Sequence, residues 1–357
     1  MSEPLNAGVL LSHDAGDASR QASARSDTQV DRHVNELAYR AAERRLWRAI
    51  GARPTERTIH LERIGVDVRL QEVGTGPPVL FIHGIATSGV SWAALAARAT
   101  GFRCLILDRP GTGLSQPLVR AVDPTTLAEM ADVFVADVLD ALELPSTHLV
   151  ANSFGGYIAL RSAAATPDRV DRMVQFSWPV GAPTRGLPLL LRALSLTAFR
   201  RVFESLPRSE RSIRMLFERM GHGDKMLDGR ISQSDLECYI ALMRHTDTMR
   251  NELAPVPALV SPFRGLARLH LPDDVLGRVV CPTLFVWGCR DPFGGEDVAR
   301  SLVARMPNAE LELLPDGGHS PWLDDMDDCV TRMTRYLRHG SGESLADEPE
   351  PEAALAS

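Results

Sequence analysis

Residues 148–165 read HLVANSFGGYIALRSAAA. An apolar run, His148 to Ala151, comes first, and apolar residues at helical spacing follow Ser153. This order is close to the strand–turn–helix elbow G-x-S-x-G, with Ala151 in place of the first glycine, in which a sharp turn exposes a serine above a sheet. The stretch predicts a nucleophilic Ser153, although a serine before a helix also suits a simple N-cap.

The remaining pattern predicts an α/β fold with a mostly parallel, doubly wound sheet and helices on both faces. Short apolar runs recur along the chain, and each is followed by a turn and a helical pattern, which is typical of strands buried in a parallel sheet. Besides the run at His148, they are Val79 to Ile82, Cys104 to Leu107, Met173 to Phe176, Thr283 to Trp287 and Leu311 to Leu314.

Other elements are predicted around these strands. Apolar residues at helical spacing from Val34 to Ile50 indicate a leading helix. Residues 59–70 alternate apolar and polar side chains on either side of Ile64-Gly65, as in an antiparallel hairpin. Asp123 and Pro124 are typical of a helix N-terminus.

One long interval lacks a strand pattern and predicts a domain boundary. Helical stretches occupy Pro183 to Val280, at Leu187 to Leu206, Ser209 to Met220 and Gln233 to Leu253. We therefore expect a core made of residues 31–182 and 281–339, with a helical cap at 183–280 inserted late in the sheet. Residues 1–30 are expected to be a disordered arm, and the acid-rich segment 340–357 is expected to be a disordered tail.

Composition excludes several classes of protein. The 357 residues carry a net charge of −7 without a basic patch, so we expect no nucleic-acid partner. The five cysteines contain no CxxC pair, which argues against a disulfide framework or a zinc site. No apolar run approaches the ~18 residues of a membrane span, and no secretory signal is visible. A cytoplasmic protein with a small-molecule substrate, no metal and no cofactor is expected; the oligomeric state is left open.

Two further residue types follow strands later in the chain. Asp291 ends the segment WGCRD after the strand at Thr283, and His319 lies in PDGGHSP after the last strand. Asp291 alone would suit a helix cap, and His319 alone would suit a turn. Because the order serine, acid, histidine is that of a triad built at one sheet edge, the three together predict Ser153 as nucleophile, His319 as base and Asp291 as its partner.

A fourth motif, Phe81-Ile-His-Gly84-Ile, follows the first parallel strand. Gly84 allows the loop to aim a backbone N–H at the reacting carbonyl. The amides of Ile85 and Phe154 are the predicted oxyanion donors. His83 is interpreted as a histidine bonded to loop backbone and not as a rival base.

Together these features resemble the α/β-hydrolase family over about Ile59 to Leu337. The resemblance is carried by His83-Gly84, the segment DRPGTGLS at 108–115, the Ser153 elbow, Gly288-x-x-Asp291 and Gly318-His319. It implies that the 108–115 segment is a structural loop and that the cap roofs the site. The sequence departs from the family after Asp291. Many members have a proline a few residues after the acid, whereas here Pro-Phe-Gly-Gly follows Asp291 directly.

The resemblance leaves several activities open. The leading interpretation is a carboxylic-ester hydrolase acting through an acyl-enzyme on Ser153. A carbon–carbon bond hydrolase of dienol ketone acids is the alternative, because that branch often has Asn-Ser-x-Gly-Gly, although its Gly-Pro-Gly run is replaced here by Ile85-Ala-Thr-Ser-Gly89. An acyltransferase or perhydrolase would use the same triad. A catalytically silent small-molecule receptor is the alternative outside enzymes.

Overall fold

A computed structural model describes residues 35–184, 186–187, 189–205, 209–223 and 231–340. Its centre is one eight-stranded sheet in the order β1-β2-β4-β3-β5-β6-β7-β8, in which β1, β2 and β4 pair antiparallel and all other neighbours pair parallel. The strands are β1 (Thr55–Leu61), β2 (Val66–Val73), β3 (Pro78–Ile82), β4 (Arg103–Leu107), β5 (Thr147–Asn152), β6 (Val170–Phe176), β7 (Thr283–Gly288) and β8 (Ala309–Leu314). The predicted fold class is confirmed.

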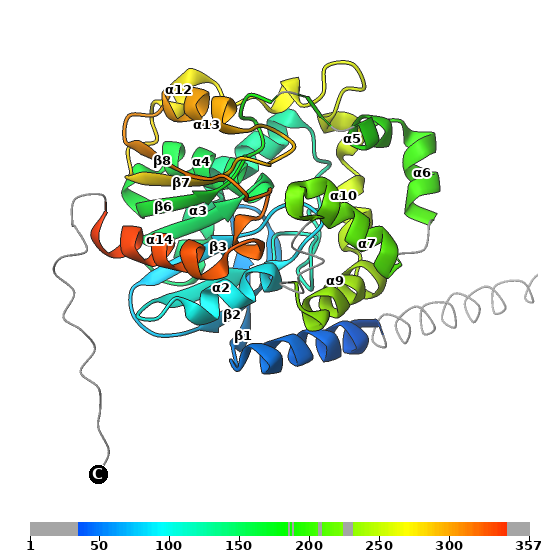
Figure 1. Ribbon diagram of the computed structural model, residues 1–357, viewed down its shortest axis with the longest axis horizontal. Helices are drawn as coiled ribbons and strands as arrows, with labels where there is room; N and C mark the ends of the chain where they lie inside the picture. Colours follow the sequence, from blue (N-terminus) through cyan, green and yellow to red (C-terminus); the bar gives the residue numbers. More distant parts are fainter. Residues whose placement is uncertain (1–34, 185, 188, 206–208, 224–230, 341–357) are drawn as a thin grey trace, which may run out of the picture.

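Helices cover both faces of the sheet (Figure 1). One face carries α3 (Pro124–Ala141), α4 (Phe154–Ala165), α12 (Asp273–Leu276) and α13 (Glu296–Val303). The other carries the helix at 35–50, η1 (Gly89–Trp92), α2 (Ala93–Arg98) and α14 (Met326–His339). Single-turn helices η2 (Pro167–Arg169), η4 (Ala267–Leu269) and η5 (Pro321–Leu323) lie in connections.

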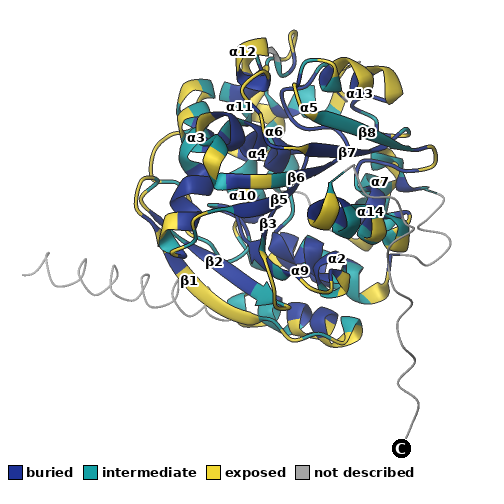
Figure 2. Ribbon diagram, turned by 90° about the vertical axis from the view of Figure 1, so that its left-hand side faces the viewer, coloured by how far each residue is buried: buried dark blue, intermediate teal, exposed yellow. Residues whose placement is uncertain are grey.

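The central strands are rich in apolar residues because both of their faces are covered by helices. In β3, Leu80 and Ile82 belong to one buried cluster, whereas Val79 and Phe81 belong to the other. This two-residue alternation is the pleat of a strand that is covered on both sides. β1 differs, since it is an edge strand whose first four residues are exposed (Figure 2). No described helix combines the length and apolar character that crossing a bilayer requires.

α3 begins where its sequence predicts. The Asp123 carboxylate accepts hydrogen bonds from the amides of Thr125 and Thr126. In turn, the Thr126 hydroxyl oxygen accepts a hydrogen bond from the Asp123 amide. This reciprocal capping box satisfies amides that the first helical turn leaves without acceptors. Pro124 occupies the first helical position, where a missing N–H has no cost.

Most of the interval between β6 and β7 is helical and lies to one side of the sheet (Figure 1), whereas α12, near its end, packs on the face of the sheet that carries α4 and α13. The interval contains α5 (Leu189–Leu194), α6 (Thr197–Ser205), α7 (Glu210–Phe217), the π-turn η3 (Glu218–His222), α9 (Gln233–His245), α10 (Thr248–Leu253) and α11 (Val256–Leu259). We call residues 183–280 the cap. Among its described residues, the only β pairing is an isolated bridge between Ser261 and Gly265.

Two of the predicted cap helices are broken. The first is interrupted at Ser195, whose hydroxyl donates to the Arg192 carbonyl at 2.6 Å. The third is interrupted at Thr246, whose hydroxyl donates to the Leu242 carbonyl at 2.7 Å. Hydroxyl side chains that bond nearby carbonyls compete with the helix ladder, and this explains both breaks. The predicted end at Leu206, the arm at 1–30 and all but residue 340 of the tail lie outside the described residues.

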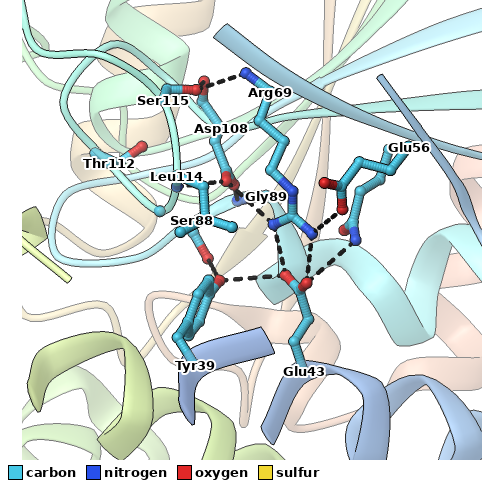
Figure 3. A network of polar contacts seen from close by, with 12 residues as sticks. Tyr39, Glu43, Glu56, Arg69, Ser88, Gly89, Asp108, Thr112, Leu114 and Ser115 are labelled. Carbon is cyan, nitrogen blue, oxygen red and sulfur yellow. Dashed lines mark hydrogen bonds and ion pairs between the residues drawn. The ribbon is translucent and has the colours of Figure 1, made fainter. Parts of the chain in front are cut away.

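A buried ionic network attaches the helix at 35–50 to the sheet. The Arg69 guanidinium of β2 contacts the carboxylates of Glu43, Glu56 and Asp108 (Figure 3). The side chains of Arg69 and Glu43 are each only 4% exposed, and Glu43 also accepts a hydrogen bond from Tyr39 at 3.3 Å. Asp108 in turn accepts from the amides of Gly89 and Leu114, at 2.8 and 3.1 Å. The network therefore connects the N-terminal helix to the loops at the carboxyl ends of β3 and β4.

We expect the Arg69→Leu variant to lose about 3–5 kcal/mol of unfolding free energy, because removing one partner of a buried ion pair leaves the other charges uncompensated. Chemical denaturation measures the loss. Arg300→Ala is the matched control: it removes an exposed pair with Glu296 one helical turn away and should cost less than about 0.5 kcal/mol. Equal losses in the two variants would contradict this role of the network.

Candidate active site

Ser153 occupies a strained turn between β5 and α4. Its φ of 55° and ψ of −117° place a non-glycine residue in a conformation that costs about 1–3 kcal/mol. Its side chain makes no capping bond to α4, so the simple N-cap interpretation does not describe it. The serine is 8% exposed.

The glycine pair after Ser153 lets the turn sit against neighbouring strands. A Cβ at Gly155 would lie 2.0 Å from the Ile82 carbonyl oxygen, and one at Gly156 would lie 2.4 Å from Oε1 of Gln175. Neither distance leaves room for a side chain. The elbow is therefore packed directly against the ends of β3 and β6.

His319 and Asp291 are brought together across two loops. His319 Nδ1 lies 2.7 Å from Asp291 Oδ2, and both residues are buried. The Asp291 carboxylate also accepts from the amides of Trp178 and Phe293, at 3.1 and 2.9 Å. Since backbone amides only donate, the carboxylate acts as an acceptor and His319 Nδ1–H donates to it. A neutral imidazole with its proton on Nδ1 has its lone pair on Nε2.

The surroundings of this pair hold it in place. The Phe293 ring contacts both Trp178 and His319, with centroid distances of 4.7 and 4.8 Å. α13 begins at an N-cap formed by Gly295, so Asp291 is not the cap of that helix. Although Asp291 follows β7, its bond to Trp178 places its carboxylate beside the end of β6.

The loop after β3 passes next to the serine. A Cβ added to Gly84 would lie 3.0 Å from the Cβ of Ser153, which is close to the limit for side-chain contact. Within the described part of the chain, the Ile85 amide donates to no acceptor, and the Phe154 amide starts α4, where the helix supplies none. Both predicted donors are thus available at this edge of the sheet.

The Arg109 side chain fixes the backbone of that loop. Its guanidinium donates to the carbonyls of His83 and Gly84, at 2.9 and 2.8 Å, and lies 4.7 Å from the Phe154 ring centroid. It also pairs with Glu252 of α10 at 2.9 Å, and both side chains are buried. The pair connects the cap to the loop that carries Ile85.

His83 is fully buried and takes part in the loop's backbone bonds. Its Nε2 accepts from the Arg109 amide at 3.1 Å, and its Nδ1 lies 2.9 Å from the Gly84 carbonyl. Burial, with the nearby Arg109 charge, holds the pKa of His83 well below its usual range. A histidine that uses both nitrogens inside the loop has no lone pair left to serve as a base.

Several residues that shape the site were not predicted from the sequence. Asn152 Nδ2 donates to the carbonyls of Phe176 and His319, at 2.8 and 2.9 Å. Ser177, with φ 51°, donates to the Gly318 carbonyl and accepts from the Gly288 amide. Asn152 had a signal in the sequence, since it stands directly before Ser153, the predicted nucleophile. Ser177 had none, because only tertiary structure brings it to the His319 loop.

Comparison with known proteins identifies the family. Residues 79–332 match the family described as "Alpha/beta hydrolase family". The chain belongs to this family. The predicted family and the expectation of a hydrolase are thereby confirmed.

Individual relatives of this hydrolase differ in activity. A 2-hydroxy-6-oxononadienedioate/2-hydroxy-6-oxononatrienedioate hydrolase of Cupriavidus pinatubonensis is 27% identical over 258 residues, 71% of this chain and 84% of that protein. The structure of a 2-hydroxy-6-oxo-6-phenylhexa-2,4-dienoate hydrolase from Rhodococcus sp. strain RHA1 aligns with a TM-score of 0.64 and 20% identity, over 80% of this chain and 99% of that one. The naproxen esterase of Bacillus subtilis aligns with a TM-score of 0.65 and 19% identity, over 85% of this chain and 98% of that one.

Metal-ligating side chains do not cluster in the described ranges: no group of three or more His, Cys, Asp or Glu residues there is placed to hold an ion.

We expect the buried, neutral His83 to make stability depend on pH. The unfolded histidine binds a proton near pH 6.5, whereas the folded one does so only well below that value, so unfolding free energy falls as pH drops below about 6.5. One such group contributes a slope of at most about 1.4 kcal/mol per pH unit. Urea unfolding from pH 8 to pH 5 should show this fall in unfolding free energy in the wild type and not in His83→Asn. Parallel curves for the two proteins would contradict the assignment.

Proposed function

We propose that this chain is a serine hydrolase that cleaves the carbon–carbon bond beside the ketone of a dienol ketone acid. The observation that carries the chemistry is the hydrogen-bonded pair Asp291–His319, held at the same sheet edge as the strained Ser153 turn. The substrate class is supported by the 27% identical relative from Cupriavidus pinatubonensis and by the Asn152-Ser-x-Gly-Gly elbow.

In the first half-reaction, His319 Nε2 takes the Ser153 proton while Oγ bonds to the carbonyl carbon of the ketone. The amides of Ile85 and Phe154 hold the resulting oxyanion. When the carbonyl re-forms, the carbon–carbon bond breaks and its electron pair leaves with the departing fragment. His319 then returns its proton to that fragment, and the acyl group stays on Ser153.

A carbon leaving group needs an electron sink. In the keto tautomer of a 2-hydroxy-6-oxo-2,4-dienoic acid, the released electron pair is conjugated through an alkene to the 2-keto group. The departing carbanion is therefore a dienolate. In the second half-reaction, His319 deprotonates a water, which attacks the acyl ester and releases a carboxylic acid and Ser153.

Ester hydrolysis is the second candidate function. It is favoured by the loop Ile85-Ala-Thr-Ser-Gly89, which lacks the Gly-Pro-Gly run usual in the carbon–carbon branch. The same serine, histidine and amides act on an ester carbonyl, where the leaving group is an alkoxide and needs no conjugated sink.

Assays of 2-hydroxy-6-oxo-6-phenylhexa-2,4-dienoate and of p-nitrophenyl esters from acetyl to long acyl separate the two functions. We expect a higher kcat/KM on the dienoate, and loss of all turnover in Ser153→Ala because the acyl-enzyme cannot form. Ser301→Ala, on the exposed face of α13, is the control and should keep full activity. Preference for the esters would instead support the second candidate. Turnover that survives in Ser153→Ala would contradict the nucleophile.

Asp291→Asn tests the role of the acid separately. The side-chain amide cannot accept from His319 Nδ1 and both backbone donors at once, so the imidazole proton moves to Nε2 and the base is lost. We expect kcat to fall by about 10⁴-fold, as tautomer loss does in serine hydrolases. Asp316→Asn, on the same loop as His319 but paired at the surface with Arg290, should change kcat little. Similar kcat values for the two variants would argue against Asp291.

A further inference from the structure

A second buried histidine–aspartate pair lies behind the loop that carries His319, residues 316–320. His222 comes from the π-turn η3 of the cap, and Asp324 follows η5. The two residues are 1% and 4% exposed. The proposed triad uses neither of them, and His222 belongs to a different part of the chain from the loop it contacts.

The hydrogen bonds of His222 define its proton position. Its Nδ1 lies 2.9 and 3.0 Å from the two Asp324 oxygens, and its Nε2 accepts from the Ser320 amide at 3.2 Å. A backbone amide only donates, so Nε2 carries no proton and Nδ1 donates to Asp324. The imidazole thus acts as a rigid connector between a carboxylate and the loop backbone.

Three consecutive amides of the His319 loop are held in this way. The Gly318 amide donates to Asp324 Oδ2 at 2.7 Å, the His319 amide to the Met220 carbonyl at 2.9 Å, and the Ser320 amide to His222. Two of the three acceptors, Met220 and His222, belong to the cap. On the opposite side, Asn152 binds the His319 carbonyl. The backbone at His319 is therefore fixed through both its N–H and its C=O.

The cap turn also fits the loop sterically. Gly221 has a φ of 91°, and a Cβ there would lie 2.7 Å from the Arg290 carbonyl oxygen and 2.9 Å from the Gly318 Cα. A Cβ on Gly318 would lie 2.6 Å from the Met220 carbonyl oxygen and 2.7 Å from His222 Cε1. The turn is in direct contact with the loops of both His319 and Asp291.

Cap packing alone would be satisfied by an apolar residue at position 222. Burying a histidine and a carboxylate is costly unless their polar atoms are bonded, and here the bonds are made to the amides on either side of His319. The arrangement resembles the outer residues that orient a metal-bound histidine, whose loss typically costs 10–100-fold in function.

We propose that His222 and Asp324 are positioning residues that hold the His319 backbone, so that activation of Ser153 requires the cap turn to be docked on the His319 loop. The proposal rests on the proposed role of His319 as the base. It assigns to the cap a part in the chemical step in addition to any contact with substrate.

The test compares His222→Leu, which loses both bonds, with His222→Gln, whose side-chain oxygen accepts from Ser320. The rate of Ser153 labelling by a fluorophosphonate probe reports nucleophile activation without depending on the natural substrate. We expect His222→Leu to lower the labelling rate and kcat 10–100-fold with KM within about twofold, and His222→Gln to recover most of the loss. Asp324→Asn, which keeps the shape of the pair, should lower labelling in the same way and covers the case in which His222→Leu does not fold.

His148→Leu is the matched control. It replaces a buried histidine at the opposite end of β5, far along the strand from Ser153, and should leave the labelling rate unchanged. Unchanged labelling in folded His222→Leu or Asp324→Asn would overturn the positioning role, as would a rise in KM at constant kcat. If the wild type itself is not labelled, Ser153 is not an activated nucleophile, and the proposed function fails together with the inference.

Discussion

The backbone at Ser153 has to change from a buried strand to a helix within one residue, and the rest of the site is arranged around this constraint. The turn is strained, so it persists only because neighbours hold it: β3 and β6 leave no space beside Gly155 and Gly156, and the Gly84 loop passes against the serine Cβ. The serine is thereby placed at the carboxyl edge of the sheet, where the strands β3, β6, β7 and β8 all end. Each of the loops that follow these strands contributes a group to the site.

The sequence was sufficient to predict the elements that depend on a local pattern of residues. The strand runs, the Ser153 elbow and the residues after β7 and β8 each depend on a pattern of a few neighbouring residues, and parallel strands bring such segments to one edge. Long-range polar partners carry no such pattern. His222 lies 102 positions from Asp324, and Ser177 lies 141 from Gly318, so nothing in either segment indicates the other. The breaks at Ser195 and Thr246 were missed because hydroxyl–carbonyl bonds are weak local competitors of a helix.

Support for the site also extends to the N-terminal helix. Asp108 bonds the amides of Gly89 and Leu114 with one carboxylate, and its charge is balanced by Arg69, which is itself held by Glu43 of that helix. A carboxylate with these donors and this counter-ion is tightly oriented. The helix at 35–50 therefore fixes the loops that support the proposed oxyanion donors, although it lies outside the region that matches the family, residues 79–332.

The cap is joined to the carboxyl edge of the sheet, where the candidate active site lies, at two separate points. Glu252 of α10 pairs with Arg109, which supports the Gly84 loop, and η3 binds the amide of His319 while its His222 binds that of Ser320. One attachment lies behind the proposed oxyanion donors and the other behind the proposed base. Both are buried and charged or polar, so separating either from its partner would leave unsatisfied groups. A substitution that shifts the cap would thus also move the loops of the proposed oxyanion donors and the proposed base. Under the proposed mechanism, a change in substrate choice would then be coupled to a change in catalytic rate.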